Sequence, residues 1–249
     1  MTIDSSQLQS QAAALKLYGL QDHWHELNEQ QLQWLSIWFE WELAARNDRG
    51  VERRLRHARI GRFKPLVDFD WQWPKKIDQH AIAELMQLTF MDNADNVILL
   101  GNNGVGKSTI AQNIAWQAAT RGHSVLYTNA AEMLNELAAQ DSDSVLKRRL
   151  KRYTNPQLLV IDEVGYLSYG ASHADLLFQI ISQRYEVKST MVTTNLPFSE
   201  WNSVFPAASC VIALIDKLVH HSQIIAIEGK SWRMKEAEEQ AEQRRKNRG

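Results

Sequence analysis

The sequence predicts an α/β protein, with a parallel sheet flanked by helices and a small all-helical domain before it. After residue 77, short apolar runs alternate with longer segments of helical periodicity, which is the pattern of a parallel sheet. Before residue 63, apolar residues recur at helical spacing without a strand signal. A glycine-rich turn joins the first apolar run to the helix that follows it.

The expected elements of the sheet domain are short strands and the helices that connect them. The expected strands are 97–100, 124–127, 158–161, 191–194 and 224–227, and the expected helices are 77–91, 110–119, 130–140, 145–153, 175–185 and 213–221. We expect four parts in the chain: a helical DNA-binding and assembly domain over 1–63, a linker over 64–76, a P-loop domain over 77–235 and a charged tail over 236–249. The tail is expected to be a lone helix or disordered.

The helical segment 8–63 is expected to break at Gly19 and Gly50. Trp34, Trp38 and Trp41 fall at i, i+4 and i+7 of one helix, a spacing that puts them on one face. Such a stripe is more often core than a platform for stacking bases, so we expect core. The linker contains Phe69, Trp71 and Trp73, whose alternation suggests that it is pinned against the following domain.

Composition is that of an ordinary soluble protein, since 44% of the 249 residues are hydrophobic and 23% are charged. No window is apolar enough to cross a membrane, and the N-terminus lacks the apolar core of a signal peptide. Cys210 is the single cysteine and excludes an internal disulfide. The expected location is therefore cytoplasmic.

Positive charge is clustered although the net charge is −1. Eight cations between Arg46 and Lys64 oppose only two acids, and further basic groups lie at 147–152 and 244–248. Each cluster alone is compatible with a solvated helix face, but three together favour contact with a nucleic-acid backbone. The candidate DNA-binding residues are Arg53, Arg54, Arg56 and Arg59.

The glycine-rich turn has the Walker A pattern G-x-x-x-x-G-K-[ST], with a strand before it and a helix after it. Its backbone N–H groups and the helix N-terminus suit a phosphate chain. Lys107 can reach the β- and γ-phosphates, and Ser108 can ligate Mg²⁺. The candidate residues for binding ATP are Gly101, Asn102, Asn103, Gly104, Val105, Gly106, Lys107, Ser108 and Thr109.

A Walker B pattern follows, with the apolar run 158–161 ending in Asp162 and Glu163. Asp162 is placed to hold Mg²⁺, and Glu163 is available to orient and deprotonate the attacking water. The second carboxylate argues for a hydrolase, since a small-molecule kinase must keep water from the γ-phosphate.

The strand 191–194 ends in polar residues beside the Walker B strand. We favour Asn195 over Thr194 as the side chain that contacts the γ-phosphate or the attacking water, the sensor 1 position of AAA+ ATPases. The alternative is a turn-forming asparagine before Leu196 and Pro197.

The chain resembles the IstB family, ATP-binding helpers of bacterial insertion sequences related to the DnaC helicase loaders. The resemblance covers about residues 10–236 and rests on TTNLPFSEW at 193–201, IDEVGYL at 161–167, ALIDKLVHH at 213–221 and IEGKSWR at 227–233. The first of these strings is highly specific.

The resemblance implies an AAA+ ATPase that assembles as a homo-oligomer on duplex DNA when ATP is bound. It implies an integrase-type transposase, encoded alongside, as the partner, with hydrolysis tied to release or activation. ATP would lie between subunits, where a cation of the neighbour completes the site. This cation is called the finger. Most relatives have arginine where this chain has Lys217, so the finger here is either Lys217 or Arg184. Arg233 is the candidate sensor 2 residue.

Three alternatives stay open at this stage: a replicative helicase loader of the DnaC type, a P-loop kinase acting on a small metabolite, and a nucleotide switch without turnover. His220 and His221 have no acid or cysteine beside them at metal spacing, so a zinc site is not expected.

Overall fold

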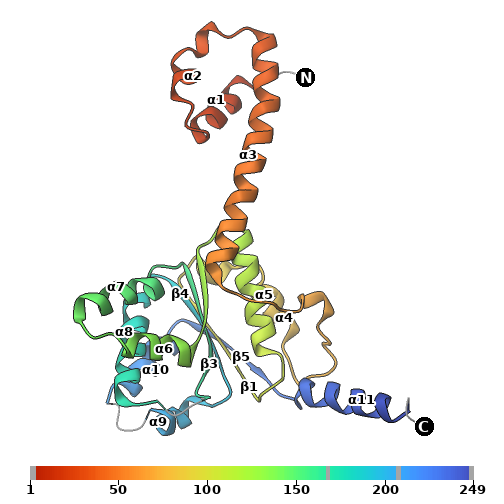
Figure 1. The fold of residues 1–249 in the computed structure, drawn as a ribbon, viewed down its shortest axis with the longest axis vertical. Coiled ribbons are helices and arrows are strands. Elements are labelled where there is room, and N and C mark those ends of the chain that lie inside the picture. Colours follow the sequence, from red (N-terminus) through yellow and green to blue (C-terminus); the bar gives the residue numbers. More distant parts are fainter. Residues whose placement is uncertain (1–3, 167–168, 206–208, 247–249) are drawn as a thin grey trace. The chain divides into compact units, whose positions relative to one another are not determined.

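The computed structural model describes residues 4–166, 169–205 and 209–246 (Figure 1). The chain divides into two compact units, residues 1–53 and 54–249. The division falls inside one long helix, α3 (Glu29–Ala58), whereas the sequence places the domain boundary at residue 63. The last residues of α3 belong to the second unit because Leu55 and Ala58 pack into its core.

The first unit is helical, as expected. It contains α1 (Ser5–Ala14), α2 (Tyr18–Asp22), a 3-10 turn at Trp24–Glu26 and the first part of α3. Asp4 caps α1, and Asn28 and Gln31 form a reciprocal cap at the start of α3, with both backbone–side-chain distances at 2.9 Å. The expected breaks are wrong, because Gly19 lies within α2 and α3 continues through Gly50. Glycine only weakens a helix, and intact flanking turns carry it through.

The core of the first unit joins Leu8, Ala12 and Leu15 of α1 to Phe39 of α3. The α3 residues Leu32, Leu35 and Leu43 pack against this cluster. The expectation that the tryptophan stripe is core is wrong: Trp34, Trp38 and Trp41 are 56%, 55% and 66% exposed. The helix buries a different apolar face and leaves the tryptophans in solvent.

The second unit is built on a sheet of five parallel strands in the order β2-β3-β4-β1-β5. The strands are β1 (Asn96–Gly101), β2 (Val125–Asn129), β3 (Leu158–Val164), β4 (Ser189–Thr194) and β5 (Ser222–Ile227). Each coincides with an expected strand. Because all the strands run in one direction, the carboxyl ends of β1, β3 and β4 meet at one edge of the sheet.

Helices cover both faces of the sheet (Figure 1). On one face α4 (Gln79–Leu85) and α5 (Lys107–Thr120) enclose a core with Val97, Leu99 and Val160. On the other face, Ile98, Leu159 and Ile161 contribute to a core with four helices. These are α6 (Ala130–Ala138), α7 (Asp143–Thr154), α8 (Ala171–Arg184) and α10 (Val211–Val219). Successive side chains of a strand therefore pack into the two different cores. The predicted α/β sheet flanked by helices is confirmed.

Shorter elements of the unit include 3-10 turns at Thr89–Met91 and Phe198–Glu200, and α9 (Trp201–Val204). The expected helix 77–91 is shorter, since α4 ends at Leu85 and Leu88 has a left-handed backbone. The tail forms one helix, α11 (Trp232–Lys246). Among the described residues, none of the helices combines the length and hydrophobicity needed to cross a bilayer.

The linker is an integral part of the second unit. It contains a 3-10 turn at Leu66–Asp68, and Asn113 of α5 holds it through hydrogen bonds to Leu66 N and Lys64 O, both 2.9 Å. Phe69 packs edge-on against Trp71, and Trp73 packs edge-on against Trp232. The expectation that its aromatics pin it to the following domain is confirmed.

Candidate nucleotide-binding site

The Walker A loop connects β1 to α5, and a side chain at two of its glycines would be strained and crowded. Gly104 and Gly106 have φ of 78° and 103°, in the left-handed region. A Cβ on Gly104 would lie 2.2 Å from Ser231 Oγ, and one on Gly106 would lie 2.4 Å from the Phe69 ring. The loop is therefore enclosed by the linker on one side and by the start of α11 on the other.

Lys107 is the first residue of α5, and its side chain turns back over the loop. Its ammonium donates to Gly101 O at 2.6 Å and to Asn102 O at 2.9 Å. Burial lowers the pKa of Lys107, the nearby Asp162 and Glu163 carboxylates oppose this, and the Arg233 charge adds to it. A buried cation held by loop carbonyls suits an incoming polyphosphate, which can replace those acceptors with charged oxygens.

Asp162 lies at the carboxyl end of β3 and accepts three hydroxyl hydrogen bonds. Ser108 Oγ donates to Oδ1 at 3.0 Å, Thr193 Oγ1 also donates to Oδ1, and Tyr127 OH donates to Oδ2 at 2.6 Å. The Ser108 hydroxyl and the Asp162 carboxylate are hard oxygen donors side by side, which is the donor set that Mg²⁺ prefers. The residues present therefore fit the expected metal.

Glu163 follows Asp162 at an irregularity in the pairing of β3 with β4, where the register shifts between Ile161 and Val164. Its φ is 63°, a left-handed conformation that a non-glycine residue adopts only where its surroundings impose it. The bulge directs consecutive carboxylates differently. Asp162 is buried in its hydroxyl cluster, while Glu163 lines the cavity and accepts from Asn129 Nδ2 at 2.8 Å.

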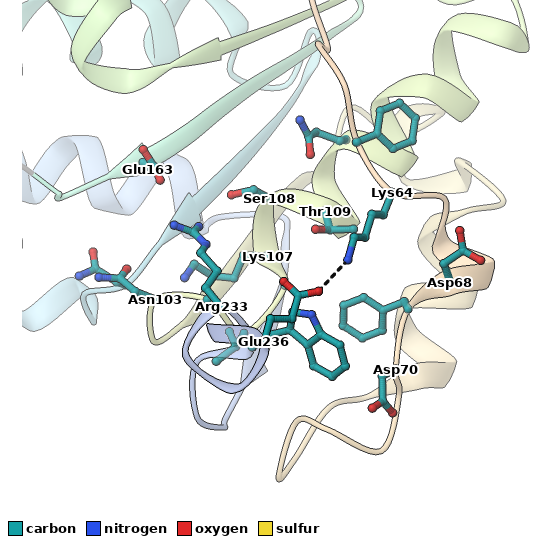
Figure 2. Close-up of a pocket in the computed structure, with 18 of the residues that line it drawn as sticks. Lys64, Asp68, Asp70, Asn103, Lys107, Ser108, Thr109, Glu163, Arg233 and Glu236 are labelled. Atoms are coloured by element: carbon teal, nitrogen blue, oxygen red, sulfur yellow. Dashed lines mark hydrogen bonds and ion pairs between the residues drawn. The ribbon is translucent and has the colours of Figure 1, made fainter. Parts of the chain in front are cut away.

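A cavity of about 540 Å³ opens above the Walker A loop (Figure 2). The loop and α5 form its floor, and Glu163, Thr194 and Asn195 approach it from the ends of β3 and β4. Its remaining walls come from segments far apart in the sequence: Arg62, Phe63, Lys64, Asp68, Phe69, Asp70, Trp232, Arg233 and Glu236. Lys64 and Glu236 pair across it at 3.0 Å, as Figure 2 shows. Its volume is that of a pocket for a small-molecule cofactor.

The structure brings most predicted site residues to this cavity. Asn103, Lys107, Ser108, Thr109, Glu163, Asn195 and Arg233 line it together. The carbonyls of Gly101 and Asn102 accept hydrogen bonds from Lys107. Asp162 is connected to the cavity by its hydrogen bond from Ser108, which lines it. Arg233 projects from α11 toward the loop, beside Lys107 in Figure 2.

Lys217 lies elsewhere, on α10 near the amino end of β1. Its ammonium sits 4.4 Å from the centre of the Tyr185 ring, and its carbonyl faces Asn96 Nδ2. This is the opposite edge of the sheet from Ser108 and Asp162. Lys217 thus stays a candidate for acting on the nucleotide of a neighbouring subunit only.

Arg184, the other candidate finger, is 1% exposed. Its guanidinium donates to the carbonyls of Tyr153, Pro156, Gln157 and Ser189 and to Thr190 Oγ1. Burial lowers its pKa to about 9, which still leaves it charged at neutral pH. The expectation that Arg184 could act on a neighbour is wrong, because the side chain is buried and each of its three nitrogens donates a hydrogen bond within its own unit.

The candidate DNA-binding arginines differ from one another. Arg53, Arg56 and Arg59 are exposed, whereas Arg54 is half-buried and donates to Ala119 O at 2.8 Å, at the end of α5. On α7, Arg149 and Arg152 pair with Glu136, while Lys147, Arg148 and Lys151 are exposed. The side chains of the basic group at 244–248 lie outside the described residues.

From the sequence, no metal is expected at His220 and His221, because no acid lies beside them at metal spacing. The fold brings Glu186 to 3.9 Å from His220 Nδ1 and 3.8 Å from His221 Nε2. The premise does not hold in the fold, since the partner comes from the α8–β4 connection. All three side chains are exposed.

Sequence reasoning missed several residues of the site. Tyr127, Asn129 and Thr193 lie at the carboxyl ends of β2 and β4, and this position in a parallel sheet was the available signal. Sensor reasoning favoured Asn195, yet Thr193 is the β4 residue whose hydroxyl bonds both Asp162 and the Glu163 N–H, the latter at 2.9 Å. The alternating linker aromatics, Phe69 among them, indicate contact with the second unit, but no motif links the linker residues to this site.

The fold and the site together define a P-loop protein with a nucleotide-binding site. Residues 3–240 match the family described as IstB-like ATP binding protein. The chain belongs to this family. It is 35% identical to the insertion sequence IS21 putative ATP-binding protein of Pseudomonas aeruginosa, over 85% of this chain and 79% of the relative. A relative from IS5376 of Geobacillus stearothermophilus is 31% identical, over 83% and 82% of the two chains.

Solved structures agree on the fold. The crystal structure of DnaI matches 69% of this chain and 91% of its own, with a TM-score of 0.56 at 19% identity. The DnaC helicase loader matches 70% and 99%, with a TM-score of 0.51 at 18% identity. At this level of identity the likeness concerns the fold alone.

Proposed function

We propose that this protein is a Mg²⁺-dependent ATPase whose hydrolysis controls its assembly on duplex DNA, where it directs or activates a partner transposase. The observation that carries the hydrolytic part is the pair of carboxylates at the bulge of β3. Asp162 accepts a hydrogen bond from the Ser108 hydroxyl, and Glu163 lines the cavity while one of its oxygens accepts from Asn129. A protein that only bound nucleotide would need the first of these but not the second.

The chain's own residues divide the chemistry. The Walker A N–H groups and Lys107 bind the phosphates, and Ser108 and Asp162 would hold Mg²⁺. When bound, the metal neutralises developing charge on the phosphate oxygens. Glu163 orients the attacking water and accepts a proton from it. Asn195 also lines the cavity and is proposed to contact that water or the γ-phosphate, and Arg233 adds positive charge from α11.

The link to transposition rests on family membership and on the names of the relatives, which are ATP-binding proteins of insertion sequences. A transposase partner of the integrase type is part of the proposal. Duplex DNA as the platform is supported by the exposed Arg53, Arg56 and Arg59 and by the cations of α7, which suit phosphate contacts.

Assembly is proposed to place Lys217 of one subunit at the nucleotide of the next. The residue lies on the opposite edge of the sheet from its own Walker motifs, and a head-to-tail arrangement of subunits joins two such edges. A lysine can neutralise charge but lacks the planar fork of arginine. Turnover is therefore expected to be slow.

The test measures ATP turnover and assembled mass together, with and without duplex DNA, for the parent and two variants. The parent should hydrolyse ATP faster with DNA and grow in mass only with ATP. Lys107→Ala should lose ATP binding, and Glu163→Gln should bind ATP and stay assembled on DNA without turnover. Parent-like turnover by Glu163→Gln would show that Glu163 does not activate water. A mass that responds to neither ATP nor DNA would refute the assembly.

A replicative helicase loader of the DnaC type is the alternative, favoured by the shared fold. The two functions differ in partner. Binding of the ATP-loaded protein to a replicative helicase, with none to the transposase encoded beside its gene, would replace the proposal.

A further inference from the structure

Helix α3 is apolar on two opposite faces. Leu32, Leu35, Phe39 and Leu43 face the core of the first unit. The other face, which we call the tryptophan ridge, consists of Trp34, Ile37, Trp38 and Trp41 and is exposed. At about 100° per residue, the centres of the two faces lie roughly 150° apart around the helix axis. A helix that is apolar on both sides is normally covered on both sides.

The ridge lacks the partners that nucleic acid requires. A stacking platform works together with cations that hold the backbone phosphates. From residue 17 to residue 45 the sequence contains no lysine or arginine, and residues 1–53 carry eight acids against four such cations. The ridge therefore has no cations beside it to hold backbone phosphates, so stacked bases are not the occupant.

The ridge has the spacing of a helix-pairing seam. Trp34, Trp38, Trp41 and Ala45 follow one another at intervals of four, three and four, the alternation by which two helices interdigitate. Its flanks offer little unpaired charge: Gln30, Gln31 and Ala44 are neutral, and Glu42 pairs with Arg46 and Arg49 of its own helix at 2.7 and 3.4 Å. A surface without charge complementarity to a foreign partner is best matched by an identical surface.

The area is sufficient for a pair. At about 200 Å² per tryptophan side chain, three that are more than half exposed offer on the order of 350 Å². Two ridges with Ile37 would bury about 800 Å², and the flanking glutamines and alanines raise this above the roughly 1,000 Å² expected of a specific interface.

Charge fixes the orientation. The seam continues into Asp48 and Glu52, so parallel helices would place like charges against each other. In an antiparallel pair centred on Trp38, Trp38 meets its copy, and Ala45 lies opposite Gln31 of the partner. Asp48 then approaches the start of the partner's helix, where the helix dipole is positive.

We infer that the tryptophan ridge is the isologous interface of a nucleotide-independent dimer, in which α3 of two copies of this chain pair antiparallel through Trp34, Trp38 and Trp41. This dimer is separate from the ATP-dependent assembly proposed above, since it uses the first unit alone and needs no nucleotide.

The first test is the mass of the full-length protein without nucleotide, by sedimentation velocity at micromolar concentration. The parent should be a dimer, and Trp38→Glu and Trp38→Arg should each weaken dimerisation at least about thirty-fold, the effect of losing a central hot spot. Because residue 38 meets itself, a mixture of the two variants should dimerise again. The control is Trp116→Glu, at an exposed tryptophan on α5, which should stay dimeric. A monomeric parent, or a mass unaffected by Trp38→Glu, would overturn the inference.

The second test fixes the orientation with disulfides in a Cys210→Ser background. Gln31→Cys mixed with Ala45→Cys should cross-link, and each alone should not. Cross-linking of each alone would indicate parallel helices and refute the antiparallel arrangement. If Trp38→Glu left the mass unchanged but weakened DNA binding, the ridge would be a base-stacking surface instead. Recovery of the dimer in the Glu/Arg mixture separates loss of the interface from misfolding, and none of these readouts depends on ATP.

Discussion

The side-chain amide of Asn129, at the end of β2, donates a 2.8 Å hydrogen bond to Glu163 Oε2, at the end of β3. The same asparagine accepts from Ala131 N at 2.9 Å through Oδ1 and so caps α6. One residue thus connects a helix start to the carboxylate that we propose activates water. Glu163 also lines the cavity.

Asn129→Asp separates these two roles. The carboxylate keeps the cap but replaces the amide donor with a negative charge beside Glu163, so we expect turnover to fall about ten-fold or more with ATP affinity and thermal stability nearly unchanged. Asn129→Ala should lose the donor and also about 1 kcal/mol of cap. Steady-state kinetics with a thermal melt distinguish the two. Faster turnover in Asn129→Asp would mean that the bond restrains Glu163 rather than positions it.

The regular parts of this fold could be predicted because their signals are local. A buried parallel strand is a short apolar run, and the Walker motifs mark where β1 and β3 end. What could not be predicted depends on long-range packing. Trp34 and Leu35 lie next to each other in an apolar helix, and only contact with α1 decides which is buried. From the sequence alone an arginine at position 184 is expected at the surface. In the fold it is buried because it donates hydrogen bonds to carbonyls of residues 153–157.

Tyr127→Phe tests the hydroxyl cluster around Asp162. Burial raises the pKa of Tyr127, and the Asp162 carboxylate beside it adds to the effect, so the phenol remains a donor. Because this pKa lies above that of the unfolded chain, the stabilisation is fully present below about pH 10 and is lost only as the pH rises through the folded value. The variant leaves a buried carboxylate oxygen short of a donor, which should cost about 1–2 kcal/mol of stability.

The functional readout for Tyr127→Phe is a Mg²⁺ titration of ATP turnover. Asp162 loses one of its three hydroxyl donors, the one at Oδ2, so we expect the half-saturating Mg²⁺ concentration to change several-fold. ATP binding measured without Mg²⁺ should not move, because the phosphate-binding loop is untouched. A variant with parent stability between pH 7 and 9 would contradict the stabilising role of this bond.

Arg184→Met should destabilise the second unit by about 3 kcal/mol, because several buried carbonyls lose their donor together. In a domain of this size that lowers the melting temperature by roughly 6–12 °C. Arg148→Met, at an exposed position on α7, is the control and should stay within about 0.5 kcal/mol. If Arg184→Met melted like the parent but hydrolysed ATP slowly only when assembled, Arg184 would be a finger after all.

Lys217→Ala tests the proposed contact between subunits. Removing the cation should lower assembled turnover by about a hundred-fold or more, while ATP binding persists. Lys217→Arg should match or exceed the parent, since arginine adds a bidentate donor. The decisive experiment mixes Lys217→Ala with Glu163→Gln, both inactive alone. In the mixture, some interfaces combine the intact Glu163 of a Lys217→Ala subunit with the intact Lys217 of a Glu163→Gln subunit. These interfaces have both groups, so part of the activity should return. A mixture as inactive as its components would rule out action in trans.

The arginines near the end of α3 should be tested in two groups, because the structure separates them. Arg53→Ala, Arg56→Ala and Arg59→Ala together should weaken DNA binding and reduce the slope of log affinity against log salt by about 3, since each phosphate contact releases a counterion. Arg54→Ala removes the hydrogen bond to Ala119 O, so it should lower stability and leave the salt slope nearly unchanged. Lys75→Ala, at an exposed cation of the linker to which no role is assigned, serves as the surface control. If the triple variant kept the parent slope, these arginines would belong to a solvated helix face, and the duplex would have to contact α7 or the tail instead.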